Sequence, residues 1–304
     1  MRVIAVPAAL EERHVDSLFQ QCAEVSPGER VLVDARRVRW VEPYGMLALL
    51  AAGVTLGADR ELPRLELPES TDVVGYLNRM LFFEHARRVF EMERVPRRSR
   101  DASSDVLLEI TAVRSHTDVH GVVDRVQDRA GAILTRQLGY PLSAAVQFSV
   151  ILSEVCQNVV EHAQATGWVA AQTYGRTPRL ERKVVKIAVA DLGIGFRGSL
   201  SAEHAARFGD RWGDAAALEA AFIHGLTRFH DPGRGQGLQQ IRKQVGRWGG
   251  KISIRSGTAR IADVPDWDDA APLEEQLAAF RGSQIGIELP QLQATITGAN
   301  GGKP

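Results

Sequence analysis

Three polar side chains are spaced to line up on one face of a single helix. Glu154, Asn158 and His162 follow one another at intervals of four residues within the largely apolar segment 142–164. Residues four apart in a helix lie one above the other, so a helix here would stack the three groups. A carboxylate can serve as a general base, and an amide oxygen suits a hard cation such as Mg²⁺. Taken alone, the spacing is also typical of the polar face of an ordinary amphipathic helix.

An aspartate and two glycines follow a second apolar segment. Asp191, Gly193 and Gly195 come directly after residues 185–190, which we predict to form a strand. Glycines at the end of a strand let the backbone pass close to a flat ligand. With Gly198 they also match the G-x-G-x-x-G pattern of dinucleotide-binding proteins. The helix and the acidic residue that this pattern requires are not evident after Gly198, so we do not expect a dinucleotide site.

A glycine-rich segment precedes a third predicted element. Gly233, Gly235, Gly237 and Leu238 lead into a predicted helix over 237–248. Backbone N–H groups at the start of a helix can bind an anion such as phosphate. The Lys-Ser/Thr ending of a P-loop is missing, and an ordinary flexible loop remains an alternative.

Alternating strands and helices must position these groups, which predicts an α/β protein. A break rich in arginine at 94–104 separates two predicted domains, 1–93 and 105–292, and residues 293–304 form a tail. In the first domain we expect strands at 30–35 and 62–67 and helices at 46–56 and 71–78. In the second we expect five strands, near 106–110, 167–174, 183–190, 250–255 and 284–289. We expect three helices, at 117–138, 142–164 and 237–248. The span 196–232 is expected to be irregular, and 257–282 to be a turn-rich insertion.

In their order and spacing, the three motifs resemble the N, G1 and G2 boxes of the GHKL ATPase superfamily. This superfamily includes histidine kinases, anti-sigma-factor serine kinases, gyrase B and MutL. The resemblance covers 105–292 and extends to the flanking segments 241–256 and 282–290. It implies a two-layer α/β sandwich of the Bergerat type that binds ATP or ADP together with Mg²⁺.

The resemblance also implies a role for each residue. Asn158 would hold Mg²⁺, Asp191 would accept a hydrogen bond from the adenine amino group with support from Ser283, and Glu154 would be the catalytic base. The span 196–232 would form the lid over the nucleotide. The remaining implied nucleotide-binding residues are His162, Gly193, Gly195, Gly233, Gly235, Gly237 and Leu238.

Two departures favour one branch of the superfamily. Histidine kinases commonly carry a basic residue three positions after the box asparagine, where this chain has Glu161. No helix with a phosphoacceptor histidine precedes the box, and we interpret His116 and His120 as surface residues. The chain therefore resembles the anti-sigma-factor serine kinases most closely.

The N-terminal domain resembles the STAS domain of anti-sigma-factor antagonists. Residues 30–50 contain an apolar strand that ends in Asp34 and an apolar helix. Where that family has Asp-Ser-Ser-Gly, this chain has Glu42-Pro43-Tyr44-Gly45. The phosphoacceptor serine is missing, so we expect a docking module. An unrelated small α/β domain is the alternative.

Composition limits the remaining possibilities. The chain has 304 residues, 44% of them hydrophobic, with 37 basic and 37 acidic residues and a net charge of zero. This balance gives no support to nucleic-acid binding or to an anionic membrane surface. The two cysteines, Cys22 and Cys156, do not form a disulfide framework, and no export signal is evident, so we expect a cytoplasmic protein.

The expected function is that of an ATP- and Mg²⁺-dependent signalling regulator resembling an anti-sigma-type protein Ser/Thr kinase. Its partner would be a regulatory protein. Two alternatives stay open: an ATP-hydrolysing switch that works through lid closure and dimerisation, and an ATP-binding interaction module without catalysis. A homodimer is compatible with each.

Overall fold

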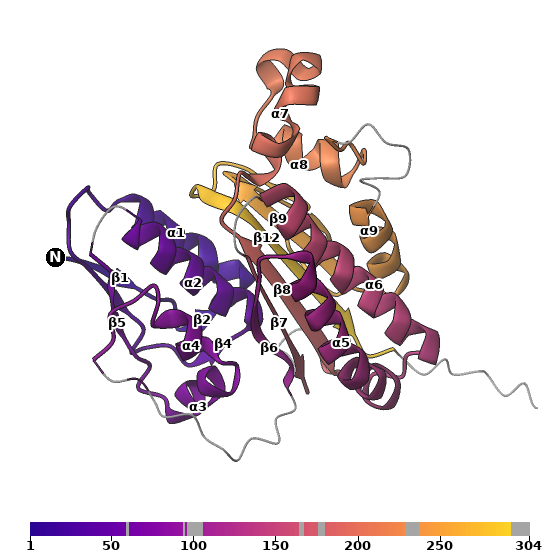
Figure 1. Ribbon diagram of the computed structural model, residues 1–304, viewed down its shortest axis with the longest axis horizontal. Helices are drawn as coiled ribbons and strands as arrows, with labels where there is room; N and C mark the ends of the chain where they lie inside the picture. The colour runs from indigo at the N-terminus through magenta and orange to yellow at the C-terminus, as the bar shows by residue number, and fades with distance from the viewer. Residues whose placement is uncertain are drawn as a thin grey trace, which may run out of the picture.

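The computed structural model describes residues 1–58, 61–93, 95, 106–163, 167–175, 180–228 and 237–292. It contains both parallel and antiparallel sheets together with helices, which confirms the α/β class. Figure 1 shows three layers: a large sheet in the middle, helices on one side, and the N-terminal elements on the other.

The large sheet has seven strands in the order β11-β10-β9-β12-β8-β7-β6, and each neighbouring pair is antiparallel. Helices α5, α6 and α9 cover one of its faces (Figure 1). The strands are β6 (Val106–Val113), β7 (Gly167–Tyr174), β8 (Val184–Asp191), β9 (Lys251–Gly257), β10 (Ala259–Asp263), β11 (Leu273–Glu274) and β12 (Phe280–Pro290). The helices are α5 (His116–Ala132), α6 (Leu142–Asn158) and α9 (Gly237–Arg247).

The N-terminal layer has a small parallel sheet in the order β1-β3-β5 and a two-stranded sheet of β2 and β4. Its strands are β1 (Arg2–Ala5), β2 (Ala9–Leu10), β3 (Val31–Asp34), β4 (Trp40–Val41) and β5 (Arg64–Glu66). Its helices are α1 (Val15–Ala23), α2 (Pro43–Gly57), α3 (Thr71–Arg79) and α4 (Phe82–Ala86), with a 3₁₀ turn η1 (Glu12–His14) before α1.

Helix α2 joins the two layers. Most of its residues are buried, which is typical of a helix that is apolar all round. It packs on β7, β8 and β12 of the large sheet. Strand β8 shows why this is possible: Val185, Ile187 and Val189 face the helical layer, whereas the small residues Ala188 and Ala190 share a core with the N-terminal layer. Alanine leaves room for α2 to approach the sheet closely.

Buried ion pairs also cross between the layers. Lys186 of β8 lies 2.8 Å from Glu42 of the N-terminal layer, and it also pairs at 3.1 Å with Glu288 of β12 in its own sheet. Arg255 of β9 lies 2.6 Å from Asp16 of α1. Because these charges are shielded from water, removing one partner would leave the other uncompensated. The N-terminal layer is therefore held to the sheet by both apolar and ionic contacts.

The position of Tyr44 follows from this packing. Tyr44 is only 6% exposed, and its carbonyl oxygen accepts a hydrogen bond from Gln284 Nε2 at 2.7 Å. The segment Glu42-Pro43-Tyr44-Gly45 thus lies against the large sheet of the same chain.

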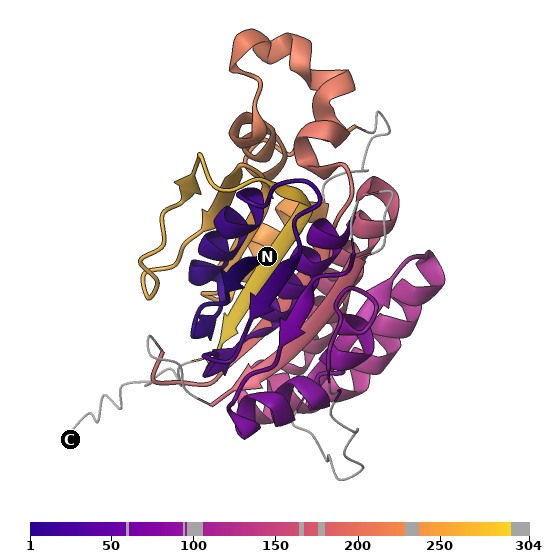
Figure 2. The same cartoon turned by 90° about the vertical axis from the view of Figure 1, so that its left-hand side faces the viewer.

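Several local expectations need correction. The span 196–232 is not irregular, because it contains α7 (Gly195–Phe208), a 3₁₀ turn η4 (Gly209–Arg211) and α8 (Asp214–Phe222). Helix α7 projects beyond the end of the large sheet (Figures 1 and 2). The 257–282 segment is not simply an insertion, since β10 and β11 extend the sheet.

Both long helices end differently from expectation. The helix expected over 117–138 consists of α5 and a π-helical turn η2 (Ile133–Gln137), and the helix expected over 142–164 consists of α6 and a π-helical turn η3 (Val159–Ala163). A helix does follow the Gly195 motif. However, β8 pairs only with antiparallel strands, so the parallel βαβ unit of dinucleotide-binding proteins is not formed there.

The domain boundary and the tail were also predicted from sequence. The 94–104 break, apart from Val95, and the 293–304 tail lie outside the described residues.

One described helical stretch, Leu142–Glu161, is long and apolar enough to cross a membrane, and half of its most apolar window is buried inside the protein. The core helix of a protein without a membrane span passes the same test, so this is weak evidence for a span.

Candidate functional site

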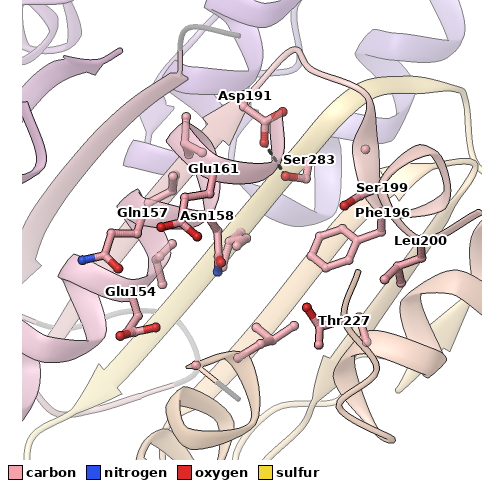
Figure 3. Close-up of a pocket in the computed structure, with 18 of the residues that line it drawn as sticks. Glu154, Gln157, Asn158, Glu161, Asp191, Phe196, Ser199, Leu200, Thr227 and Ser283 are labelled. Atoms are coloured by element: carbon pink, nitrogen blue, oxygen red, sulfur yellow. Dashed lines mark hydrogen bonds between the residues drawn. The ribbon is translucent and has the colours of Figure 1, made fainter. Parts of the chain in front are cut away.

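A pocket of about 310 Å³ lies between the C-terminal end of α6, strands β8 and β12, and the starts of α7 and α9 (Figure 3). Seven residues singled out in the sequence line it, although they are spread over 130 positions of the chain. They are Glu154, Asn158, Asp191, Gly195, Gly237, Leu238 and Ser283.

Asp191 is held at the end of β8 by three contacts. It is the direct strand partner of Ser283 in β12, and the Ser283 hydroxyl donates a hydrogen bond to Asp191 Oδ2. The backbone N–H of Gly193 donates to Oδ1 at 2.8 Å. Gly193 therefore orients the carboxylate and does not itself line the pocket. These contacts fix the direction in which Asp191 can accept a further hydrogen bond from a ligand.

Burial governs the charge state of Asp191. The residue is 4% exposed, and burial raises the pKa of its carboxyl group, while the hydrogen bonds from Ser283 and Gly193 oppose this effect. A buried acceptor that cannot reach bulk water favours a ligand that supplies an N–H group.

Gly195 allows the turn after β8 to lie against the neighbouring strands. Its φ is +66°, and a Cβ at this position would lie 2.7 Å from Ser256 Oγ and 3.0 Å from Gly282 O. Ser256 Oγ donates to Gly282 O at 2.7 Å and accepts from Phe196 N at 3.1 Å. Glycine is thus required by both conformation and space.

Glu154 lies over the first residue of α9. A Cβ at Gly237 would overlap the Glu154 carboxylate, so the two residues are in close contact. Burial raises the pKa of Glu154, and the negative charge of Glu161 raises it further. In this arrangement Glu154 presents a carboxylate at the positive end of the α9 dipole.

Asn158, the last residue of α6, lines the pocket between Glu154 and Asp191 (Figure 3). An amide oxygen at this point is a suitable ligand for a hard cation. Within the described part of the chain, no group of three or more His, Cys, Asp or Glu side chains could hold a metal ion. A Mg²⁺ ion here fits only if the phosphates of a ligand and water supply most of its oxygens.

The sequence analysis missed several pocket residues. Glu161 lines the pocket, and its spacing of seven from Glu154 could have identified it, because i and i+7 share a helical face. Residues of the span 196–232, which the sequence analysis predicted to form a lid, also line the pocket, although they were not predicted as nucleotide-binding residues. They are Phe196, Ser199, Leu200, Leu226 and Thr227.

Three predicted residues cannot be placed. Gly233 and Gly235 lie outside the described residues. The backbone of His162 belongs to η3, but its side chain also lies outside the description. Of the predicted phosphate-binding segment, only Gly237 and Leu238 are observed at the pocket.

No protein-family model matches the chain, and no curated protein matches its sequence.

Proposed function

We propose that the pocket binds ATP with Mg²⁺ and that the chain is a signalling regulator of the GHKL type. In this proposal, residues 105–292 form the Bergerat-type sandwich and residues 1–93 a STAS-like domain. The observation that carries the proposal is the convergence of three separate motifs on one pocket. Each motif alone has a common structural explanation, whereas their meeting at one pocket is what a nucleotide site requires.

Different residues of the pocket would bind the adenine, the Mg²⁺ ion and the phosphates. The adenine amino group would donate to Asp191, whose orientation by Ser283 and Gly193 favours such a contact. Asn158 would contribute its side-chain oxygen to Mg²⁺. The phosphates would meet the N–H groups at the start of α9, where the helix dipole favours an anion.

The favoured activity is transfer of the γ-phosphate to a serine or threonine of a regulatory protein, as in anti-sigma-type kinases. Glu154 would accept the proton of the attacking hydroxyl group. Its raised pKa brings the carboxyl group closer to the value that suits a general base near neutral pH. The free thiols of Cys22 and Cys156 are compatible with the reducing cytoplasm.

One observation favours the second candidate, an ATP-hydrolysing conformational switch. The lid consists of α7 and α8, and α7 projects from the body, so closure over a nucleotide would move a formed element. Such a movement could create a surface for a second copy of the chain. Turnover without transfer to a protein would favour this candidate, and ATP binding without turnover would favour the non-catalytic module.

All three candidate functions require ATP binding, and calorimetric titration of ATP with and without Mg²⁺ tests it. Asp191→Asn should bind ATP and ADP at least about tenfold more weakly, since it exchanges an acceptor oxygen for a donor in a buried site. Asp124→Asn, at an exposed position of α5, is the matched control and should bind normally. Wild-type affinity in a folded Asp191→Asn protein would overturn the proposal.

A further inference from the structure

A second cavity of about 340 Å³ lies where the N-terminal layer meets the large sheet. It is formed by α2, by α4 and the turn after it, by the residue that follows β6, and by β7, β12 and the turn after β8. It shares no lining residue with the pocket described above. The lining residues are Val54, His85, Arg88, Val89, Arg114, Trp168, Leu192 and Arg281.

Three arginines give this cavity a strong positive charge. Arg88, Arg114 and Arg281 are exposed, and no side chain in the described ranges forms an ion pair or hydrogen bond with their guanidinium groups. None of the described residues that line the cavity is acidic. Unpaired guanidinium groups that converge from separate elements favour an anionic ligand, because each can donate two hydrogen bonds to a phosphate or carboxylate.

Neighbouring carboxylates are engaged elsewhere. Glu84 pairs with Arg87 at 3.2 Å. Asp118 accepts hydrogen bonds from the backbone N–H groups of Arg114 at 2.9 Å and of Ser115 at 3.0 Å. Neither carboxylate forms an ion pair with an arginine of the cavity, although the hydrogen bonds from Arg114 and Ser115 and the charge of Arg114 lower the pKa of Asp118.

The pKa of His85 is affected by the positive charge of two of these arginines. Its Nε2 lies 3.0 Å from the carbonyl oxygen of Ile110, so this nitrogen carries the hydrogen. Burial lowers the pKa of His85 and the charges of Arg88 and Arg114 lower it further, whereas the hydrogen bond with Ile110 and the charge of Glu84 oppose this effect. A negatively charged ligand would offset this effect.

The wall of the cavity is apolar. Trp168 and Val89 are each 9% exposed and Leu192 is 7% exposed, so these otherwise buried side chains present their remaining surface here. An inorganic ion would leave this surface in contact with water. A ligand with a flat or apolar body would cover it, and a cavity of this size is large enough for a small organic molecule.

We propose that this cavity is a binding site for a small organic phosphate that carries its charge on a flat, apolar body. The phosphate would lie among Arg88, Arg114 and Arg281, and the body would lie against Trp168 and Leu192. The site exists only while the two layers are packed together, because each contributes part of it. It does not depend on the proposed nucleotide function.

The test uses the full chain and three probes: phenyl phosphate, inorganic phosphate and phenol. Calorimetry should show that phenyl phosphate binds more tightly than inorganic phosphate and that phenol does not bind. The Arg88→Ser and Arg281→Ser variants should each bind phenyl phosphate roughly tenfold more weakly, the usual effect of losing a charge-assisted hydrogen bond. Arg247→Ser, an exposed arginine of α9, is the control of equal charge and should bind normally.

Two further measurements separate this site from the nucleotide pocket. Asp191→Asn should retain phenyl phosphate binding, whatever happens to its ATP affinity. Quenching of tryptophan fluorescence by phenyl phosphate should be lost in Trp168→Phe. Equal affinity in the Arg88→Ser and wild-type proteins, loss of binding in Asp191→Asn, or no binding of phenyl phosphate to the wild type would overturn the inference.

Discussion

The start of α9 and the side chain of Glu161 have opposite effects on the negative charge of Glu154. The start of α9 stabilises its negative charge, whereas burial and Glu161 destabilise that charge. Glu154 thus lies where the phosphates of a nucleotide are proposed to lie. A nucleotide must compete with this carboxylate or displace it.

Replacing Glu154 by glutamine separates binding from catalysis. Glu154→Gln removes the charge that competes with the phosphates, so ATP should bind with equal or higher affinity. If Glu154 is the base, hydrolysis or transfer should fall by about 10²–10⁴-fold, the usual contribution of a positioned proton acceptor. Binding and turnover should be measured on one preparation, with Glu181→Gln, at an exposed position, as the control. Unchanged turnover in a folded variant would exclude the catalytic role.

At the level of single residues, sequence patterns identified the polar groups but not all of their neighbours. Asp191, Asn158 and Glu154 were predictable because their spacing relative to predicted strands and helices places them at element ends or on one helical face. The contacts of Phe196 and Thr227 with the pocket depend on how α7 and the residues after α8 pack at the end of the large sheet. That arrangement is set by tertiary packing, to which no local spacing rule applies.

At the scale of elements, α9 illustrates a glycine required by its neighbours. In Gly237→Ala, the new methyl group would overlap the Glu154 carboxylate, so either the helix start or the side chain must move. We expect weaker ATP binding, measured by calorimetry. Gly246→Ala in the same helix is the matched control, because its methyl group would meet only Asp263 Oδ2 at 3.9 Å. It should bind ATP normally and gain about 0.5–1 kcal/mol of stability.

The elements that were predicted well are those with a clear apolar pattern. The strand expected at 62–67 and the helix expected at 71–78 correspond to β5 and α3, and Ser70 caps α3 by accepting a hydrogen bond from Val73 N. Helices α7 and α8 were not predicted, because glycines and charged residues interrupt the apolar periodicity of this span. The two π-helical turns give no distinct signal, since the residues within them are ordinary helix formers.

Strands β8 and β12 carry a pH-dependent contact to the N-terminal layer. Burial raises the pKa of Glu42 to about 7, with a contribution from Glu288 and against the opposing effect of Lys186. Lys186 thus forms ion pairs with two buried carboxyl groups, those of Glu42 and Glu288. A folded carboxyl group with a raised pKa holds its proton more tightly than in the unfolded chain, where glutamate titrates near about 4.3. Its contribution to stability is complete below that value and is lost as the pH rises to about 7.

Glu42→Gln tests this contact, because the amide resembles the protonated acid at every pH. The unfolding free energy of the wild type should fall between about pH 5 and 7, by an amount on the order of 1 kcal/mol. The variant should show a flatter profile over the same interval, with a residual slope from Glu288, whose pKa is also raised by burial. Urea unfolding at several pH values measures this, and Glu91→Gln, at an exposed position, is the control. Identical slopes in the variant and the wild type would contradict the assignment.

At the scale of the whole molecule, the N-terminal layer is part of the structural core. Its buried residues form one hydrophobic cluster with Trp168, Ala188, Ala190 and Phe280 of the large sheet. Sequence analysis predicted a separate docking module, because a short α/β segment followed by an arginine-rich break resembles an independent domain. The apolar residues all round α2 indicate that both sides of this helix are buried. Which elements bury the second side depends on tertiary packing, and local sequence does not predict it.

This shared core predicts that the two layers unfold together. Leu50 of α2 is fully buried, and Leu50→Ala should lower the unfolding free energy by about 2–5 kcal/mol. The effect should extend to β8, because loss of the N-terminal layer would expose Ala188, Ala190 and the charge of Lys186 to water. Hydrogen exchange of the β8 amides should therefore accelerate together with that of β3. Leu62→Ala, at a side chain that is 44% exposed, should change neither. Faster exchange in β3 with unchanged protection in β8 would show that the N-terminal layer opens independently, as a docking module would.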